Sequence, residues 1–458
     1  MSTTTQIPAL TTSFPARGGR WIEVWRPENA LFWERTGAKV ARRNLIFSVL
    51  SEHIGFSVWS LWSVIVLFLG LKYGFDPSQK FLLTAVPTLV GSALRLPYTF
   101  AVATFGGRNW TVVAALLLLL PTALIAVVLK PGVSFGTLLL VAATAGVGGG
   151  NFASSMTNIN SYYPTRLKGW ALGVNAGGGN LGVPVVQLVG LLVLATVGVA
   201  HPRALVAIYV PLILVAAICA ATMMDNLSSA RNSRRAMRDV CKDAHTWIVS
   251  FLYIGSFGSF IGFSFAFGQV LLVQFPSSFD TPVKAASLTF MGPLLGSLIR
   301  PVGGLLADRF GGARVTLYNF VAMAAGAVTV LLASVHKSLP LFIAGFTMLF
   351  LFSGVGNGST YKMIPAIFRS KAHRSMAAGA DELHAMAGAQ RLSGALIGIA
   401  GAIGAFGGVL VNLTFRQSFL TLKNGNGAYV AFIVFYALCF ALTWAVYLRR
   451  SPSRLEGV

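Results

Sequence analysis

Twelve long apolar runs limit what this chain can fold into more than any other feature of its sequence. Each run reaches the ~20 residues that an α-helix needs to cross about 30 Å of hydrocarbon. The runs are continuous and do not alternate with a period of two, which argues against the strands of a membrane β-barrel. They lie at about 45–70, 81–105, 110–130, 135–160, 169–199, 204–224, 247–274, 285–307, 314–335, 339–365, 392–415 and 427–448. The sequence therefore predicts an all-α membrane protein with 12 transmembrane helices.

The distribution of charge predicts the orientation of the chain in the membrane. The formal net charge is +22, yet only 10% of the residues are charged. Most of the 35 Lys and Arg residues fall in the tails and in the loops on the N-terminal side of the membrane. Such an excess marks the cytoplasmic side. We therefore expect both termini in the cytoplasm, and we expect the basic charge to reflect topology, with no nucleic acid as a partner.

The second six runs repeat features of the first six, which indicates two related halves. Arg300 follows Arg95 by 205 residues, and a Gly-Ser pair precedes each arginine at the same spacing. The Phe-Gly-Gly triplets at 105–107 and 310–312 match at the same offset. Parallel repeats of this kind are typical of transporters whose binding site lies between two rocking halves.

A long polar interruption separates the two groups of runs and sets the predicted domain boundaries. The halves are pseudo-symmetric, with six helices each. The predicted parts are a cytoplasmic N-terminal segment at 1–44, the first half at 45–224, a cytoplasmic central loop at 225–246, the second half at 247–448 and a cytoplasmic tail at 449–458.

Arg95 and Arg300 are expected near the middle of the membrane, where a charged side chain costs at least ~2.5–3.5 kcal/mol. A structural ion pair would need buried acids, but of the 13 Asp and Glu residues only Glu52 lies within a predicted span. Two arginines against one carboxylate leave a surplus of positive charge, so we interpret the pair as an anion site. The planar guanidinium fork suits a small trigonal anion, although phosphate and carboxylate remain open.

The stretch "GGLLADRFGGARV" at 303–315 resembles the loop motif between the second and third helices of a half in the major facilitator superfamily. Asp308 and Arg309 are predicted to pair at the cytoplasmic rim and, with Gly304, to form a gating latch. The corresponding loop of the first half lacks the acid.

Two further stretches, "GGGNFASSMTNINSYYPTRLKGWALGVNAGGGNLGVP" at 148–184 and "GVGNGSTYKMIPAIFR" at 354–369, resemble the nitrate signatures of the nitrate/nitrite porter family (NarK-type) of that superfamily. The opening "WRPENALFWERTGAKVARRNL" is also similar, so the resemblance covers nearly the whole chain. It implies the major facilitator fold and transport by alternating access. It also implies a substrate site for nitrate or nitrite, in which two arginines grip the anion, two phenylalanines sandwich it and two further residues add polar contacts: Arg95, Arg300, Phe152, Phe257, Asn175 and Tyr253.

The family that this chain resembles contains nitrate/nitrite exchangers and proton-coupled nitrate importers. Glu52 and His53 stand early in the first span, where exchanger-like relatives are expected to be apolar. Each could carry a proton, although both could instead pair with arginines at the rim. Lys362, inside the tenth predicted span, is a third candidate and is expected to face the cavity.

We therefore predict a nitrate transporter, with nitrite as a possible second substrate, coupled to protons and acting as a monomer in the inner membrane of a prokaryote. The alternatives are a nitrate/nitrite antiporter and an anion channel. An enzyme is not expected, because neither a nucleophile–base pair nor a metal cluster stands out. Three scattered cysteines do not form a metal site, and no cofactor is expected.

Overall fold

The computed structural model describes residues 20–229, 234–449, 455 and 457–458. The parts of the predicted tails and central loop that fall on 1–19, 230–233, 450–454 and 456 lie outside these described residues. Within the described part, twelve helical segments are long and apolar enough to cross a membrane, which confirms the predicted number.

The first half contains six spans, several of which are built from two helices joined end to end. Its elements are β1 (Trp21–Ile22), α1 (Ala30–Phe32), the π-helical turn η1 (Trp33–Gly37), α2 (Ala38–Trp59), α3 (Leu61–Phe68), the 3-10 turn η2 (Leu71–Tyr73), α4 (Pro77–Phe105), α5 (Gly107–Leu117), α6 (Leu119–Val128), α7 (Phe135–Thr144), α8 (Gly146–Tyr162), α9 (Thr165–Asn180), α10 (Gly182–Thr196) and α11 (Arg203–Met223).

The central loop and the second half follow the same plan. Their elements are β2 (Asn226–Leu227), α12 (Arg234–Cys241), α13 (Ala244–Tyr253), the π-helical turn η3 (Ile254–Gly258), α14 (Ser259–Gln274), α15 (Pro282–Thr289), α16 (Met291–Phe310), α17 (Gly312–Val335), α18 (Leu339–Ala377), α19 (Glu382–Leu422), α20 (Asn426–Thr443) and the π-helical turn η4 (Trp444–Leu448).

The repeated Phe-Gly-Gly triplets end a helix at equivalent places in the two halves. Gly106 follows α4 with φ 88°, and Gly311 follows α16 with φ 91°. A side chain with a Cβ rarely adopts such a positive φ, whereas glycine does so at little cost. The triplet therefore stops each arginine-bearing helix and starts the next one.

Three helices extend further than the apolar runs predicted. The first helical segment begins at Ala30 instead of 45, α18 continues to Ala377 instead of 365, and α19 begins at Glu382 instead of 392. Hydropathy detects the length that crosses hydrocarbon, but Lys and Arg are good helix formers and do not end a helix. The helices therefore project beyond the apolar part of each span.

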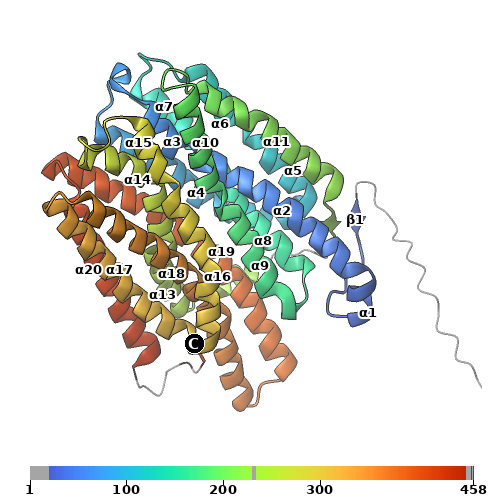
Figure 1. Ribbon diagram of the computed structural model, residues 1–458. Coiled ribbons are helices and arrows are strands. Elements are labelled where there is room, and N and C mark those ends of the chain that lie inside the picture. Colours follow the sequence, from blue (N-terminus) through green and yellow to red (C-terminus); the bar gives the residue numbers. More distant parts are fainter. Residues whose placement is uncertain (1–19, 230–233, 450–454, 456) are drawn as a thin grey trace, which may run out of the picture.

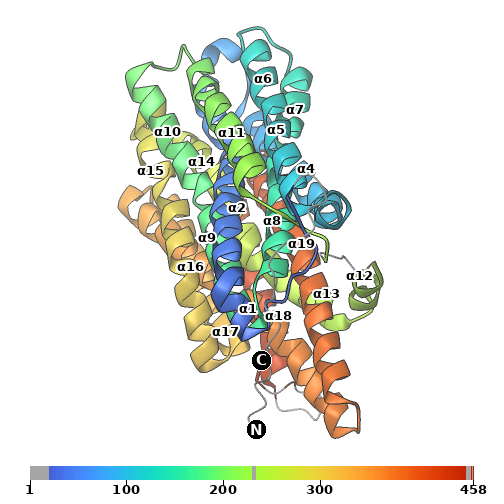
Figure 2. The same ribbon diagram turned by 90° about the vertical axis from the view of Figure 1, so that its right-hand side faces the viewer.

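The two halves lie side by side, blue to green against yellow to red in Figure 1. Helix α4 packs along α19, α14 packs along α3, and α10 packs against α15, so each half contributes to the shared interface. Figure 2 shows α1 and the C-terminal end at the bottom of the molecule, with α6 and α7 at the top. We call these the terminal face and the far face.

A two-residue strand pair fastens the N-terminal segment to the chain that follows α11. Strands β1 and β2 are parallel, with Trp21 beside Asn226 and Ile22 beside Leu227. Next to them, Asp225 is only 5% exposed. Its carboxylate accepts hydrogen bonds from Asn44 (3.0 Å), Arg20 (3.2 Å) and Arg43.

Candidate functional site

Arg95 lies inside the bundle on α4 and has no solvent exposure. Its Nε donates a hydrogen bond to the carbonyl of Gly149 on α8 (3.2 Å), and its Nη1 donates to the carbonyl of Gly401 on α19 (2.6 Å). Its Nη2 has no hydrogen-bond partner among the described residues. Arg95 thus links the first half to the second half, and one of its three nitrogens is left over.

The glycine cluster at the start of α8 explains how Arg95 reaches that backbone. A Cβ at Gly149 would lie 2.7 Å from the Trp59 ring and 2.8 Å from Gly91 Cα, and one at Gly148 would lie 2.2 Å from the Gly55 carbonyl oxygen. Only glycine permits so close an approach. Helix α8 therefore lies against α2 and α4, within reach of the guanidinium.

Arg300 occupies the corresponding place on α16 and is 7% exposed. Its Nη2 lies 3.4 Å from the Tyr253 hydroxyl, and its Cζ lies 5.6 Å from the centre of the Tyr361 ring. Its Nη1 has no partner in the described part of the chain. Neither Arg95 nor Arg300 forms an ion pair with any described carboxylate. Two buried positive charges thus remain, each with an unused nitrogen.

Phe152 of α8 and Phe257 of η3 meet across the two halves, beside Arg95. Their ring centres are 6.2 Å apart with an interplanar angle of 29°, and the Arg95 Cζ lies 4.5 Å from the Phe152 ring and 5.2 Å from the Phe257 ring. Tyr253 also stacks with Phe257, at 5.2 Å between ring centres. A flat anion between two rings needs ~7 Å, because each contact takes at least ~3.5 Å. The two rings would therefore have to separate slightly to hold an anion between them.

Glu52 of α2 is 1% exposed, at the edge of this site. Its Oε2 accepts hydrogen bonds from the Asn175 amide of α9 (2.7 Å) and from the Ser155 hydroxyl of α8, while its Oε1 has no partner among the described residues. A Cβ at Gly179 would lie 2.3 Å from Oε1, so this glycine makes room for the carboxyl group. Glu52 is thus held by neutral donors, and Asn175, expected to contact the anion, donates to Glu52 here.

His53 points to a different place from its neighbour Glu52. Its Nδ1 lies 3.1 Å from the carbonyl oxygen of Gly178 on α9, and its side chain is partly buried. Neither residue makes the alternative pair with arginines at the rim within the described chain. His53 therefore meets the backbone of α9, whereas Glu52 accepts hydrogen bonds from side chains of α8 and α9.

The structure corrects the prediction for Lys362. This side chain does not face the cavity: its Nζ lies 2.7 Å from Asp308 Oδ2 on α16, and the two side chains are 40% and 55% exposed. The predicted partner of Asp308, Arg309, instead lies over the Phe310 ring at 5.1 Å. A Cβ at Gly304 would lie 3.7 Å from Lys362 Cε, so the glycine borders the same pair. Packing of α16 along α18, which sequence spacing cannot show, brings Lys362 to the rim.

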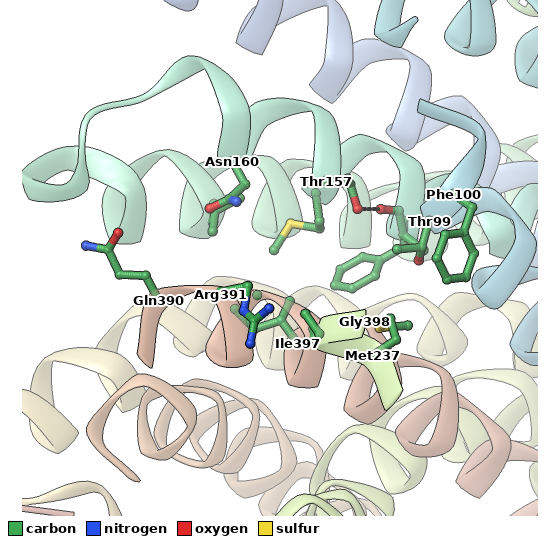
Figure 3. A pocket seen from close by; sticks show the side chains of 16 residues that line it. Thr99, Phe100, Thr157, Asn160, Met237, Gln390, Arg391, Ile397 and Gly398 are labelled. Atoms are coloured by element: carbon green, nitrogen blue, oxygen red, sulfur yellow. Dashed lines mark hydrogen bonds between the residues drawn. The ribbon is translucent and has the colours of Figure 1, made fainter. Parts of the chain in front are cut away.

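A cavity of about 190 Å³ lies between the two halves, on the terminal side of Phe152. Figure 3 shows Thr157 and Asn160 of α8 on one wall, facing Gln390 and Arg391 of α19 on the other. Met237 of α12 also lines it. The cavity therefore extends from Phe152 toward the terminal face.

The far side of the interface is closed by contacts between the halves. Thr84 of α4 donates to Asn412 of α19 (2.7 Å), and Gln187 of α10 donates to the carbonyl of Ser264 on α14 (2.7 Å). Phe81 stacks with two rings of α19, Phe415 at 5.7 Å and Phe419 at 5.4 Å. On this side the halves are thus joined by hydrogen bonds and ring contacts, whereas the cavity lies toward the terminal face.

Three neighbours of the site were not singled out from the sequence: Ser155, Tyr361 and Gly401. Tyr361 follows Ser155 by 206 residues, close to the offset of the arginines, but the two residue types differ, so the repeat alone does not mark them. Each lies next to the charged group of its half, Ser155 beside Glu52 and Tyr361 beside Arg300. Gly401 accepts a hydrogen bond from Arg95 through its backbone carbonyl, so no pattern of side chains predicts this contact.

Comparisons with known proteins agree with this architecture. The Major Facilitator Superfamily model matches residues 53–402. The "Nitrate/nitrite transporter NarU" of Salmonella typhimurium is 41% identical over 94% of this chain and 96% of its own length. The "Probable nitrate/nitrite antiporter NarK2" of Thermus thermophilus is 33% identical over 95% of this chain and 98% of its own. Among solved structures, a D-xylose–proton symporter superposes with a TM-score of 0.66 at 16% identity, covering 92% of this chain and 99% of that one, which supports the fold alone.

Proposed function

Since this chain belongs to the Major Facilitator Superfamily and, within it, to the nitrate/nitrite transporter family, we propose that it imports nitrate by alternating access together with protons. The twelve spans make it a multi-pass membrane protein of the same class as its relatives. We further propose that nitrite is a second substrate, because the name of the Salmonella relative includes both anions.

The observation that carries the anion assignment is the pair of buried arginines without acid partners. Arg95 and Arg300 each keep one guanidinium nitrogen without a partner among the described residues. A buried charge without a counter-charge is costly, and an anionic ligand would supply one. Phe152 and Phe257 offer two ring faces beside Arg95 that suit a flat ion. Tyr253, near Arg300, would add a hydroxyl contact.

The observation that favours proton coupling is the buried carboxyl group of Glu52, close to the arginines but paired with neither. Nitrate bound between the arginines brings a negative charge near this group. Protonation of Glu52 removes one negative charge, so the binding of nitrate and of a proton would each favour the other. His53 is the second candidate, whereas Lys362 is bound to Asp308 at the rim, away from the arginines.

The second candidate function is exchange of nitrate for nitrite. The Thermus thermophilus relative carries the word antiporter in its name. In an exchanger, the empty site must resist switching between its two states, and the Arg95–Gly401 hydrogen bond between the halves is a contact of this kind. The presence of Glu52 favours symport, because exchange needs no titratable group.

We propose that the terminal face is cytoplasmic and that the protein lies in the inner membrane of a prokaryote, with a monomer as the working unit. The excess of Lys and Arg on this side of the membrane supports that orientation. The cavity between the halves would then open to the cytoplasm.

Proteoliposomes that contain a pH-sensitive dye and no nitrite test the proposed coupling. Addition of external nitrate is expected to acidify the lumen as nitrate accumulates, because each imported anion brings protons with it. Lumen pH and nitrate content are followed together. Uptake that leaves the lumen pH unchanged and requires preloaded nitrite would establish exchange instead.

A second prediction concerns the ion pair at the rim. Asp308→Asn is expected to lower the rate of nitrate uptake about two- to fivefold while changing the free energy of unfolding by less than ~1 kcal/mol, since exposed ion pairs contribute little to stability. The expected change in rate rests on the proposed gating role of this rim, where the pair joins α16 to α18 of the same half. The double exchange Asp308→Lys with Lys362→Asp is expected to recover most of the rate. Failure of this exchange to recover uptake would show that the charge pair is not what matters.

A further inference from the structure

A row of buried polar side chains runs between α2 and α8, inside the first half. The members lie at positions i, i+4, i+7 and i+8 of α2 and at i, i+3, i+4 and i+7 of α8, so in each helix they share one face. Although they lie within the membrane span, none is more than 7% exposed. The members of this α2–α8 polar row are Asn44, Ser48, Ser51 and Glu52 of α2, and Asn151, Ser154, Ser155 and Asn158 of α8.

A small cavity of about 10 Å³ lies in the row, and Glu52 and Asn151 are both part of its wall. Thr111 of α5 lines it as well. Both amide atoms of Asn151, which is 4% exposed, and the Oε1 of Glu52 lack a partner among the described residues. A polar cavity of this size accommodates one water molecule, and a buried water needs two to four polar partners. The geometry suits one ordered water that is held by Asn151 and Glu52.

The row continues from Glu52 to the terminal face. Ser155 donates to Glu52, and Ser48 lies 3.3 Å from Ser155 through their hydroxyl oxygens. Further along, Asn158 keeps an amide nitrogen without a partner in the described chain. Asn44 then contacts Asp225, whose arginine partner Arg43 is 37% exposed. The distance from Glu52 to Asn44 is about 12 Å, for eight residues of helix at ~1.5 Å each.

The charges around Glu52 favour proton movement along this row over proton movement through the cavity between the halves. Arg95 on α4 and Arg300 on α16 exert a positive field on Glu52 from the side of the anion site. The neighbours on α8 and α9, Ser155 and Asn175, are neutral, and Tyr361 of α18 stands beside Arg300. The charged groups of the row stand at its outer end, where Asp225 binds Arg20 and Arg43. Two buried arginines repel a hydronium ion from the cavity between the halves, whereas the row offers neutral hydroxyls.

We propose that the proton carried by Glu52 is exchanged with the terminal side along the α2–α8 polar row, so that proton and nitrate use separate routes there. This inference rests on the proposed proton coupling. The carboxylic acid of Glu52 gives its proton to Ser155 or to the cavity water, and each hydroxyl or water passes one proton on as it accepts one. The last proton passes to water at the terminal face, and Glu52 is left as a carboxylate. Nitrate leaves through the larger cavity between the halves.

The second half does not repeat the row. At an offset of 206 residues, Asn151 corresponds to Asn357, but Asn158 corresponds to Ile364 and Ser155 to Tyr361. Ile364 packs into the main hydrophobic core. The polar path therefore belongs to the half that contains Glu52.

Two asparagines on α8 provide a matched test. Asn158 belongs to the row, and Asn160 lines the cavity between the halves. In proteoliposomes, Asn158→Leu, a change of similar shape, is expected to slow nitrate-driven lumen acidification about tenfold. It should leave exchange of labelled for unlabelled nitrate within about twofold of the wild type. Asn160→Leu is expected to alter nitrate and proton movement together. If Asn158→Leu does not insert, Thr111→Val at the wall of the small cavity takes its place.

The outcomes separate the two proposals. Wild-type protein that acidifies the lumen while Asn158→Leu and Thr111→Val do so at the same rate would overturn the separate route and leave proton coupling intact. Wild-type protein that exchanges nitrate without any acidification would overturn both. Loss of acidification with retained exchange in the row variants, but not in Asn160→Leu, would support the route.

Discussion

Replacement of Arg95 by lysine is expected to reduce nitrate uptake at least a hundredfold, with the protein still inserted in the membrane. Arg95 uses Nε for Gly149, Nη1 for Gly401 and has Nη2 left for the anion. A lysine carries the same charge on one nitrogen, which cannot reach two carbonyls and a ligand in three directions. Hydrogen bonds to charged groups contribute ~1.5–3 kcal/mol each, so the loss of two costs a hundredfold or more in affinity.

The same substitution at Arg300 is expected to have a similar effect, because its free Nη1 and its Tyr253 contact also depend on the fork. Uptake of labelled nitrate into vesicles measures the loss, and the amount of protein in the membrane fraction normalises it. Arg391→Lys is the matched control, since this arginine is 43% exposed at the cavity mouth and binds Asp239. Normal uptake in either Arg95→Lys or Arg300→Lys would exclude an anion clamp.

Glu52→Gln is expected to separate nitrate transport from proton transport. Glutamine has nearly the same shape, and its carbonyl can still accept from Asn175 and Ser155, but it cannot take up a proton. Nitrate-driven acidification of the lumen, and accumulation driven by a pH gradient, should fall more than tenfold. Exchange of labelled for unlabelled nitrate should stay within about threefold of the wild type, because the arginines are untouched.

His53→Gln serves as the matched control, one residue away on the same helix. Since His53 contacts the Gly178 backbone and not the arginines, acidification is expected to persist. If acidification survives in Glu52→Gln and disappears in His53→Gln, the proton carrier is the histidine. If both variants acidify at the wild-type rate, neither residue couples the proton.

The helices and the pairing of the two halves could be predicted because they depend on local composition and on a repeated spacing. Apolar length marked the twelve spans, and the Phe-Gly-Gly triplets marked equivalent helix ends. The partners of individual side chains could not be predicted in the same way. Lys362 meets Asp308 because α16 and α18 pack along one another, and no spacing within either helix encodes that contact.

The site shows the same distinction. The sequence identified Glu52 as the one acid within a span, and the structure places it among Asn175 and Ser155, close to the arginines. The hydrogen bond from Asn175 to Glu52 could not be predicted from the sequence, because it depends on the packing of α9 against α2. The contact with the Gly401 carbonyl could not be predicted for a different reason. Every residue has a backbone carbonyl, and the path of α19 alone decides that the carbonyl of Gly401 lies beside Arg95.

The small number of buried charges also has a consequence for the response to voltage. With Glu52 ionised, the two arginines and this carboxylate give the empty core one net positive charge. Nitrate adds one negative charge, and a proton on Glu52 cancels it, so the loaded core would have the same net charge as the empty one. A carrier that moves one proton per nitrate would then move no net charge in a complete cycle, so the nitrate gradient it can reach would not depend on the membrane potential. With a second proton, on His53, each cycle would move one positive charge inward, which would appear as a nitrate-dependent current. Measurement of this current therefore distinguishes one proton per nitrate from two.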